Sequence, residues 1–182
     1  DGSFLETQDM FRMAGIIRSV YLTAVPQVRV NDVVAIPDFD SNYINGALNV
    51  RLSFDNLSRK DAKHYSVHCA LYPVELYGDR AAGTPAARAS AAVHDITRGG
   101  KEQCEMQLTV PNAKHWSAEA PWRYVLVGEL KDGKGRTVET FSTYTGFRKV
   151  EIRDTPARHD EFGKAGRYFY VNGRTVKLKG VN

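Results

Sequence analysis

Two groups of residues in this chain have the types and spacing that could bind a metal ion. Asp38, Asp40 and Asn42 stand at alternate positions, as the first ligands of an EF-hand calcium loop do. Such a loop also needs glycine at its sixth position and glutamate at its twelfth, where this chain has Tyr43 and Asn49. The segment is therefore predicted to be a turn and not a calcium site.

The second group is a pair of histidines. His64 and His68 are four residues apart and would share one face of a strand. Zinc sites use three or four protein ligands, and no third ligand stands at a helpful spacing. A solvated sheet face is therefore favoured over a metal site.

Acidic residues are numerous enough to make glycoside hydrolysis a candidate chemistry, since it needs two carboxylates about 5 to 10 Å apart. Glu119 lies close to Pro121 and Trp122, while Asp160 and Glu161 lie in a polar stretch, so these carboxylates are predicted to be solvated. The sequence has no G-x-S-x-G motif, P-loop or dinucleotide fingerprint. The motifs alone predict no catalytic residue in this chain.

The two cysteines lie in runs that alternate between apolar and polar residues. Cys69 shares a face with Leu71, and Cys104 shares one with Met106 and Leu108. Free cysteines are among the most buried residues, so two buried thiols are one interpretation. A disulfide between two sheets is the other, because bridging depends on a distance that the sequence does not contain.

The elements that must position these residues are strands. Period-two alternation dominates the sequence, as in "LNVRLSF" over 48–54, and helical periodicity is nearly absent. Many short strands joined by Gly, Asp, Asn and Pro turns predict an all-β fold, an antiparallel β-sandwich. Strands are expected near 15–24, 27–36, 46–55, 64–73, 90–97, 103–110, 122–130, 137–145, 148–153, 167–171 and 174–179.

Two segments break this pattern. The Ala-rich stretch from Gly78 to Lys101 contains Gly83 and Pro85, which predict a loop or a loose edge strand. The polar stretch 154–166 is predicted to be a surface excursion between two strands.

The last segment reads as a β-hairpin. Asn172 and Gly173 suit a two-residue type I′ turn, which needs positive φ at both central positions. The register set by this turn places apolar side chains on one face, namely Phe169, Val171, Val176 and Leu178. Such a face needs a surface to cover it.

Composition limits the partners. The chain has 182 residues, 42% hydrophobic content and a net charge of +4, without a dense run of Lys or Arg. It has no apolar stretch of eighteen residues. The composition is that of a globular protein, and neither a nucleic acid nor a membrane is predicted as a partner.

Several blocks of the sequence resemble a known family. These are "QDMFRMAGIIRSV" over 8–20, "VPNAKHWSAEAPWRYVLVGEL" over 110–130, "TGFRKVEI" over 145–152 and "YFYVNGRTVKLKGVN" over 168–182. They resemble, in the same order, segments of the β-galactosidases of glycoside hydrolase family 2. The middle of the chain, about 38–108, matches that family only in its strand pattern.

The resemblance implies that this chain is an internal part of a larger enzyme. Residues 1–24 would be the terminal strand of an N-terminal sugar-binding jelly roll, and residues 25–147 an immunoglobulin-like sandwich. Residues 148–182 would be a linker and the hairpin that leads into a (β/α)₈ barrel. That barrel carries the two catalytic glutamates and lies outside this chain. The parent would hydrolyse terminal β-galactosides with retention, while this chain, without catalytic carboxylates, would be inactive and would orient the neighbouring domains.

One site residue is carried over from the resemblance. Asp9 matches an aspartate that contacts the galactosyl group and, in some members, sodium. No cofactor is expected in the chain itself, whereas the parent would use sodium and magnesium. The expected partners are the other domains of the same chain and further copies in a homo-oligomer, in the cytoplasm or periplasm of a bacterium.

Some alternatives stay open at this point. The stretch from Gly78 to Lys101 lies where some members extend a loop toward a neighbouring subunit, although a plain surface loop is favoured. A stand-alone carbohydrate-binding module would stack sugar rings on Trp116, Trp122 or Tyr124. A cell-surface interaction sandwich is a further alternative.

Overall fold

The structure is a computed structural model, and it describes residues 15–160, 163–176 and 180. Strands dominate this part of the chain. Their bounds are β1 Val28–Phe39, β2 Gly46–Asn56, β3 Ser66–Pro73, β4 Ala87–Ala92, β5 Lys101–Val110, β6 Tyr124–Lys131, β7 Thr137–Thr145, β8 Val150–Thr155, β9 Gly166–Val171 and β10 Arg174–Thr175.

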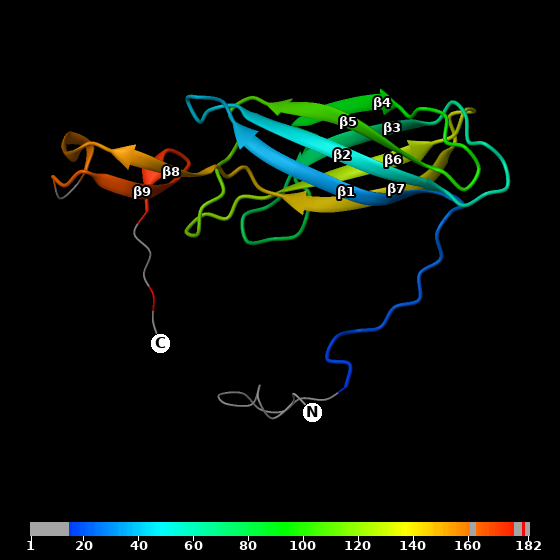
Figure 1. Cartoon of the computed structure of the whole chain (residues 1–182), viewed down its shortest axis with the longest axis horizontal. Helices are drawn as coiled ribbons and strands as arrows, with labels where there is room; N and C mark the ends of the chain where they lie inside the picture. The colour runs from blue at the N-terminus through cyan, green and yellow to red at the C-terminus, as the bar shows by residue number, and fades with distance from the viewer. Residues whose placement is uncertain (1–14, 161–162, 177–179, 181–182) are drawn as a thin grey trace.

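The first seven strands form two facing sheets (Figure 1). One sheet has the order β1-β2-β5 and the other β4-β3-β6-β7, and all neighbouring strands are antiparallel. At the two sides of the sandwich β4 lies beside β5 and β1 beside β7. A division of seven strands into three and four is the immunoglobulin-like arrangement, so the predicted all-β antiparallel sandwich is confirmed.

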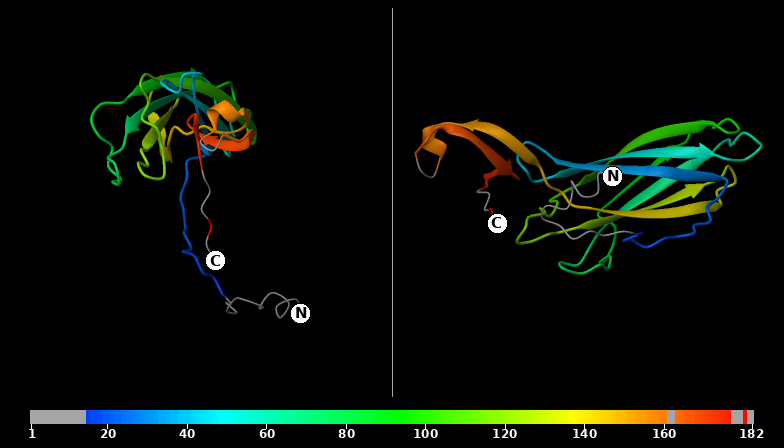
Figure 2. Two further views of the ribbon diagram at one scale, coloured as in Figure 1. Left: turned by 90° about the vertical axis from the view of Figure 1, so that its left-hand side faces the viewer. Right: turned by 60° about the horizontal axis from the view of Figure 1, so that its bottom comes forward.

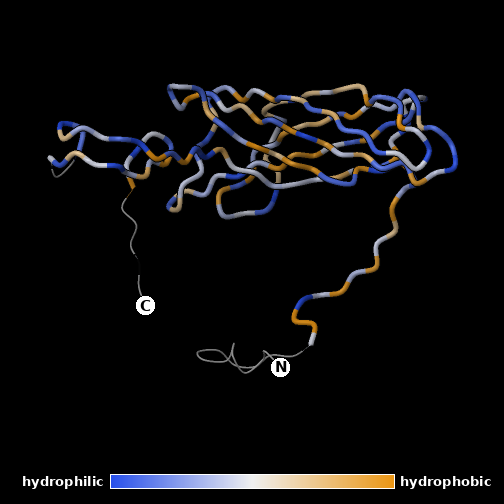
Figure 3. The backbone as a smooth tube through the Cα atoms, in the orientation of Figure 1, coloured by the Kyte–Doolittle hydropathy of each residue, from blue (hydrophilic) through white to orange (hydrophobic). Residues whose placement is uncertain are grey.

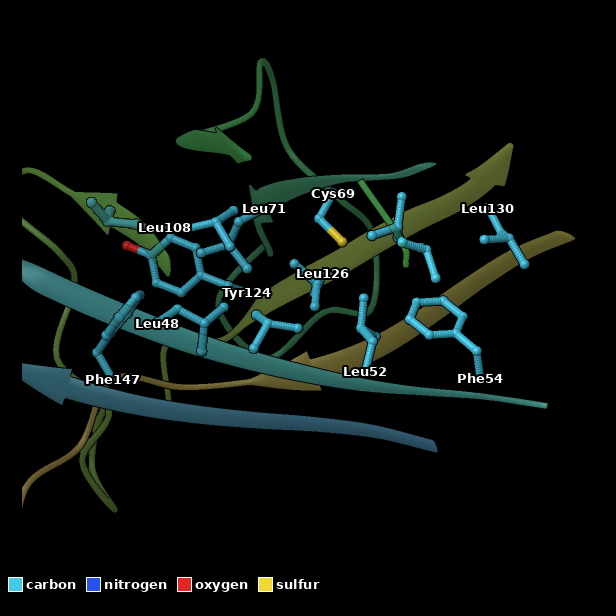
Figure 4. Packing of buried hydrophobic residues seen from close by; sticks show 14 of the residues in the cluster. Leu48, Leu52, Phe54, Cys69, Leu71, Leu108, Tyr124, Leu126, Leu130 and Phe147 are labelled. Atoms are coloured by element: carbon cyan, nitrogen blue, oxygen red, sulfur yellow. The ribbon is translucent and has the colours of Figure 1, made fainter. Parts of the chain in front are cut away.

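The core lies between the two sheets because alternate residues of each strand point inward. Leu48, Leu52 and Phe54 of β2 are fully buried and face residues of β6 such as Leu126 and Leu130 (Figure 4). This is the alternation expected for "LNVRLSF".

Phe147 closes the core at the end nearest β8. Its ring is fully buried and meets the ring of Tyr124 edge-on, with the ring centroids 5.2 Å apart. A Cβ atom on Gly46 would lie 2.5 Å from this ring, so only glycine fits beneath it.

Strands β8, β9 and β10 form a separate three-stranded sheet, which we call the small sheet, beyond one end of the sandwich (Figures 1 and 2). A short 3₁₀ turn at Ala157–His159 lies on the polar excursion between β8 and β9. Asn172 has φ of 51° and Gly173 has φ of 77°, so the predicted type I′ turn is confirmed. Residue 178, the last of the four predicted apolar positions, lies outside the described residues.

Three sequence predictions about strands need correction. Residues 15–24 form no strand in the described part of the chain, because a strand needs a hydrogen-bonding neighbour and no described residue pairs with them. The strand expected at 90–97 lies at Ala87–Ala92, where it pairs with β3 as an edge strand. His64 is not in β3 but in the turn before it, with φ of 59°.

Candidate interdomain junction

The predicted turn is confirmed at residues 40–45, between β1 and β2, and it is closed by one carboxylate. Asp40 accepts hydrogen bonds from the backbone N–H groups of Asn42 at 3.2 Å, Ile44 at 2.9 Å and Asn45 at 3.1 Å. These bonds, that from Ile44 first, hold the pKa of Asp40 below its ordinary value. The carboxylate therefore serves the turn.

The candidate metal ligands and catalytic carboxylates named in the sequence analysis do not form a site among the described residues. His64 and His68 are separated by the turn, and His68 lies on the outer face of β3, 3.2 Å from the hydroxyl of Ser66. Glu119 is exposed, and the carboxylate of Asp160 accepts a bond from the backbone of Lys164 at 2.9 Å. Within the described ranges, no three His, Cys, Asp or Glu side chains are arranged to hold a metal ion. Asp9 and Glu161 lie outside those ranges.

Both cysteines are free thiols, which decides between the two interpretations left open by the sequence. Cys69 is buried in the core, and burial raises the pKa of its thiol to about 12. Cys104 is half-buried, and burial raises its pKa to about 11. Both side chains act as small apolar groups.

A cluster of polar and aromatic side chains joins the small sheet to the sandwich. The hydroxyl of Tyr43, in the turn between β1 and β2, donates to Glu151 at 2.5 Å. Arg153 also bonds to the Tyr43 hydroxyl and to Glu151, the latter at 2.6 Å. The Arg153 guanidinium lies over the ring of Tyr170, 4.9 Å from its centroid. We call this set of four residues the junction cluster.

Two contacts on the sandwich side support the junction cluster. The ring of His115 lies 2.6 Å from the carbonyl oxygen of Tyr43 and packs against Phe39, with ring centroids 4.5 Å apart. Lys149 pairs with Asp38 at 3.0 Å. Burial raises the pKa of Asp38, but the bonds from Lys149 and from the N–H of Phe39 outweigh this and lower it.

Asn172 connects the hairpin turn to both neighbouring segments. Its side-chain oxygen accepts a bond from the N–H of Lys149 at 3.0 Å, and its side-chain nitrogen donates to the carbonyl of Trp116 at 3.0 Å. Its backbone N–H donates to the carbonyl of Lys149 at 2.9 Å. The turn is thus bonded to the sandwich as well as to its own sheet.

The small sheet has a second, apolar face that no described residue covers. Val150 is paired with Val171, and Ile152 with Phe169, across β8 and β9. On this face Val150 is 55% exposed, Ile152 60%, Phe169 45% and Val176 37%. One face of the small sheet is therefore bonded to the sandwich, and the other is open.

Residues 15–25 form a second exposed apolar segment (Figure 3). Five of its side chains are at least 76% exposed, namely Ile16, Ile17, Val20, Tyr21 and Leu22. The segment leaves the sandwich at the end opposite the small sheet (Figure 1). The described residues also include no helix that is long and apolar enough to cross a membrane.

The aromatic residues that could stack on sugar rings are either buried or in contact with a cation. Tyr124 is 3% exposed and lies in the core. The Lys114 ammonium lies 3.6 Å from the ring centroid of Trp122, and the Arg148 guanidinium lies 4.6 Å from that of Trp116. Both tryptophans are half-buried and have a cation on one ring face.

Sequence reasoning did not find the junction cluster. In the sequence, Tyr43 served only as an argument against an EF-hand loop. Glu151 and Arg153 were predicted only as polar residues of a short strand. One signal was available: the side chains of Glu151 and Arg153 share a face of that strand with opposite charges, opposite to the apolar Val150 and Ile152.

Comparison with known sequences places this architecture in a family. The sequence profile of Glycosyl hydrolases family 2 matches residues 28–148, from the start of β1 to the residues before β8. This is more than half of the chain, so the chain belongs to glycoside hydrolase family 2.

Individual curated proteins are similar to this chain over its whole length. The chain is 34% identical over its whole length to a β-galactosidase of Aeromonas hydrophila and 30% identical to one of Priestia megaterium. It spans 16% of the length of each of these curated relatives.

Solved structures share the fold. A β-glucuronidase of Bacteroides uniformis superposes with a TM-score of 0.67 at 17% identity, covering 86% of this chain and 17% of the other. A putative β-galactosidase from Bacteroides fragilis gives a TM-score of 0.57 at 18% identity, covering 84% of this chain and 19% of the other. At these identities the structures show a common fold.

Proposed function

We propose that this chain is the non-catalytic immunoglobulin-like part of a β-galactosidase and that it orients the sugar-binding and catalytic domains. The names of the relatives support hydrolysis of β-galactosides as the parent activity. Retention of configuration at terminal β-galactosides is part of the proposal. In this proposal residues 1–24 belong to the sugar-binding domain, 25–147 form the sandwich, and 148–182 lead into the catalytic barrel.

The observation that carries the orienting role is the junction cluster. Tyr43 comes from the sandwich, whereas Glu151, Arg153 and Tyr170 come from the small sheet. Hydrogen bonds have restricted geometry, so this set restrains the angle between the two parts. A misplacement of about 1 Å by a remote support can lower a rate on the order of a hundredfold.

The open face of the small sheet supplies the contact to the barrel in this proposal. Full burial of a Val, Ile or Phe side chain stabilises by roughly 1.5 to 3 kcal/mol. Val150, Ile152, Phe169 and Val176 are 37% to 60% exposed, so they obtain only part of this within the described residues. A barrel packed on this face would bury them.

The exposed segment 15–25 supplies the contact to the sugar-binding domain in the same way. Both of its alternating faces carry apolar residues, as expected for a strand covered on both sides. Asp9 in this domain would contact the galactosyl group and sodium. Sodium and magnesium in the parent and a homo-oligomeric assembly are further parts of the proposal.

The stand-alone carbohydrate-binding module has less support. Sugar rings stack on accessible aromatic faces, whereas Tyr124 is in the core and both tryptophan rings carry a cation.

The parent activity is tested by reading the gene on both sides of this chain and assaying two proteins. We expect a barrel with two catalytic glutamates after residue 182 and turnover of a nitrophenyl galactoside by the longer protein. The 182-residue chain should show none. A stop codon directly after residue 182, or robust turnover by the chain alone, would contradict the proposal.

The orienting role is tested in the longer protein by Arg153→Met. We expect kcat/KM to fall roughly tenfold or more, because the barrel loses its fixed angle. The matched control is Arg136→Met, which breaks a similar ion pair, Arg136 to Asp132 at 2.7 Å, in the β6–β7 turn at the far end of the sandwich. Equal activity of the two variants would refute the orienting role.

A further inference from the structure

The turn at Asn172 and Gly173 does more than close a hairpin. We propose that Asn172 is a positioning residue: its side-chain amide clamps the hairpin to the sandwich at Trp116 and thereby sets the angle at which the chain leaves the sandwich. This inference rests on the proposed function for its catalytic consequence, but the clamp itself can be tested separately.

The turn alone does not require the side chain of Asn172. A type I′ turn needs positive φ at both central positions, and glycine adopts such angles at least as readily as asparagine. The bonds of Asn172 to the backbone of Lys149 and to Trp116 are additional to the turn. The amide is therefore available for a second role.

Trp116 is itself held in place by contacts to the sandwich, so its carbonyl can anchor the Asn172 amide. Its backbone N–H donates to the carbonyl of Phe147 at 2.9 Å, and Phe147 is fully buried in the core. Its ring packs closely on Gly146, where an added Cβ would lie 3.1 Å from the ring, and the Arg148 guanidinium covers it. A bond to the carbonyl of Trp116 thus ties the hairpin to the core.

The second residue of the turn is fixed from the other side. A Cβ atom on Gly173 would lie 2.8 Å from the ring of Tyr43, so the turn packs directly on a member of the junction cluster. The turn is therefore held at Trp116 through Asn172 and at Tyr43 through Gly173. Loss of the amide donor would leave the turn intact but remove one of these two holds.

Two variants separate the turn from the clamp. Asn172→Gly keeps the backbone geometry and removes both side-chain bonds. Asn172→Asp keeps the acceptor for Lys149 and removes the donor to Trp116. The control is Asn112→Gly, because Asn112 also has positive φ, 50°, but lies in the turn after β5.

The clamp is measured in the 182-residue chain by residual dipolar couplings of backbone amides in the two parts. In the unmodified chain and the control, one alignment tensor should fit both the sandwich and the small sheet. In both Asn172 variants, two tensors should be needed, while the β9–β10 hydrogen bonds persist. A single tensor in both variants would overturn the clamp.

The positioning role is measured in the longer protein. We expect Asn172→Asp to lower kcat about tenfold with KM little changed, and the control to leave both unchanged. Two tensors together with unchanged kcat would overturn the positioning role. Since the coupling measurement needs no activity, failure of the proposed β-galactosidase function is distinguishable from failure of the clamp.

Discussion

The sandwich and the small sheet are antiparallel β structures joined end to end, yet they are stabilised differently. The sandwich buries its apolar side chains between its own two sheets, with Phe54 and Phe147 fully buried. The small sheet bonds to the sandwich through its polar face and leaves Ile152 and Phe169 about half exposed. Hydrophobic burial dominates folding free energy, so the sandwich should be stable alone, whereas the small sheet depends on its neighbours.

The largest effect should distinguish two phenylalanines. Phe147→Ala should lower the free energy of unfolding by about 3 to 5 kcal/mol, because it leaves a cavity in the sandwich core. Phe169→Ala, at a position 45% exposed, should cost less than about 1 kcal/mol. Urea denaturation of both variants measures this. Similar losses would mean that the small sheet is buried in solution.

The next effect concerns a buried amide of the sandwich. Asn56 is fully buried, and its side-chain nitrogen donates to the carbonyls of Lys60 at 2.8 Å and Ile96 at 3.0 Å. Asn56→Ala leaves these carbonyls without that donor, so a loss of about 2 to 3 kcal/mol is expected in the same assay. The control Asn49→Ala, on the exposed outer face, should stay within about 0.5 kcal/mol of the unmodified chain.

A smaller and local effect is expected at the junction. Arg153→Met removes the bonds to Glu151 and Tyr43, so amide hydrogen exchange in β8 and β9 should become about tenfold faster. Exchange in β2 and β6 should not change, because the sandwich core is untouched. Faster exchange throughout the chain would show that the two parts unfold together.

The smallest effect is a pH dependence of the same junction. The folded-state pKa of Asp38 lies below its ordinary value of 3.8, so the contribution of its pair with Lys149 is complete above that value. The contribution is lost as the pH falls through the folded-state pKa. The protection factors of β8 and β9, in which the exchange rate is corrected for the intrinsic pH dependence of amide exchange, should therefore fall on acidification. Asp38→Asn should remove this component, and an unchanged pH profile in that variant would contradict the assignment.

The sequence predicted the sandwich well because each of its strands carries its own alternating pattern. In β2, Leu48, Leu52 and Phe54 alternate with polar residues, and the structure buries all three. Residues 15–24 have a similar apolar content, but a strand also needs a partner, and none is present among the described residues. An alternating sequence pattern predicts a strand reliably only where the partner strand that it pairs with is part of the same structure.

The junction could be predicted only in part. The turn at Asn172 and Gly173 follows from two adjacent residues, and the structure confirms it. The bond from Asn172 to Trp116 joins residues 56 positions apart, and no local pattern contains it. The same holds for Tyr43 and Glu151, which meet only after the sandwich has placed the β1–β2 turn beside β8.

The identity of the turn also has a consequence for the chemical ageing of this protein. An asparagine followed by glycine is the order most prone to deamidation: the backbone nitrogen of the glycine attacks the side-chain amide carbon, ammonia leaves, and water then opens the resulting cyclic imide to a carboxylate. The bonds to Lys149 and Trp116 hold the amide of Asn172 in place and should slow this reaction. Once the amide is released, the resulting carboxylate has no N–H to offer Trp116. Loosening of the junction would then become irreversible.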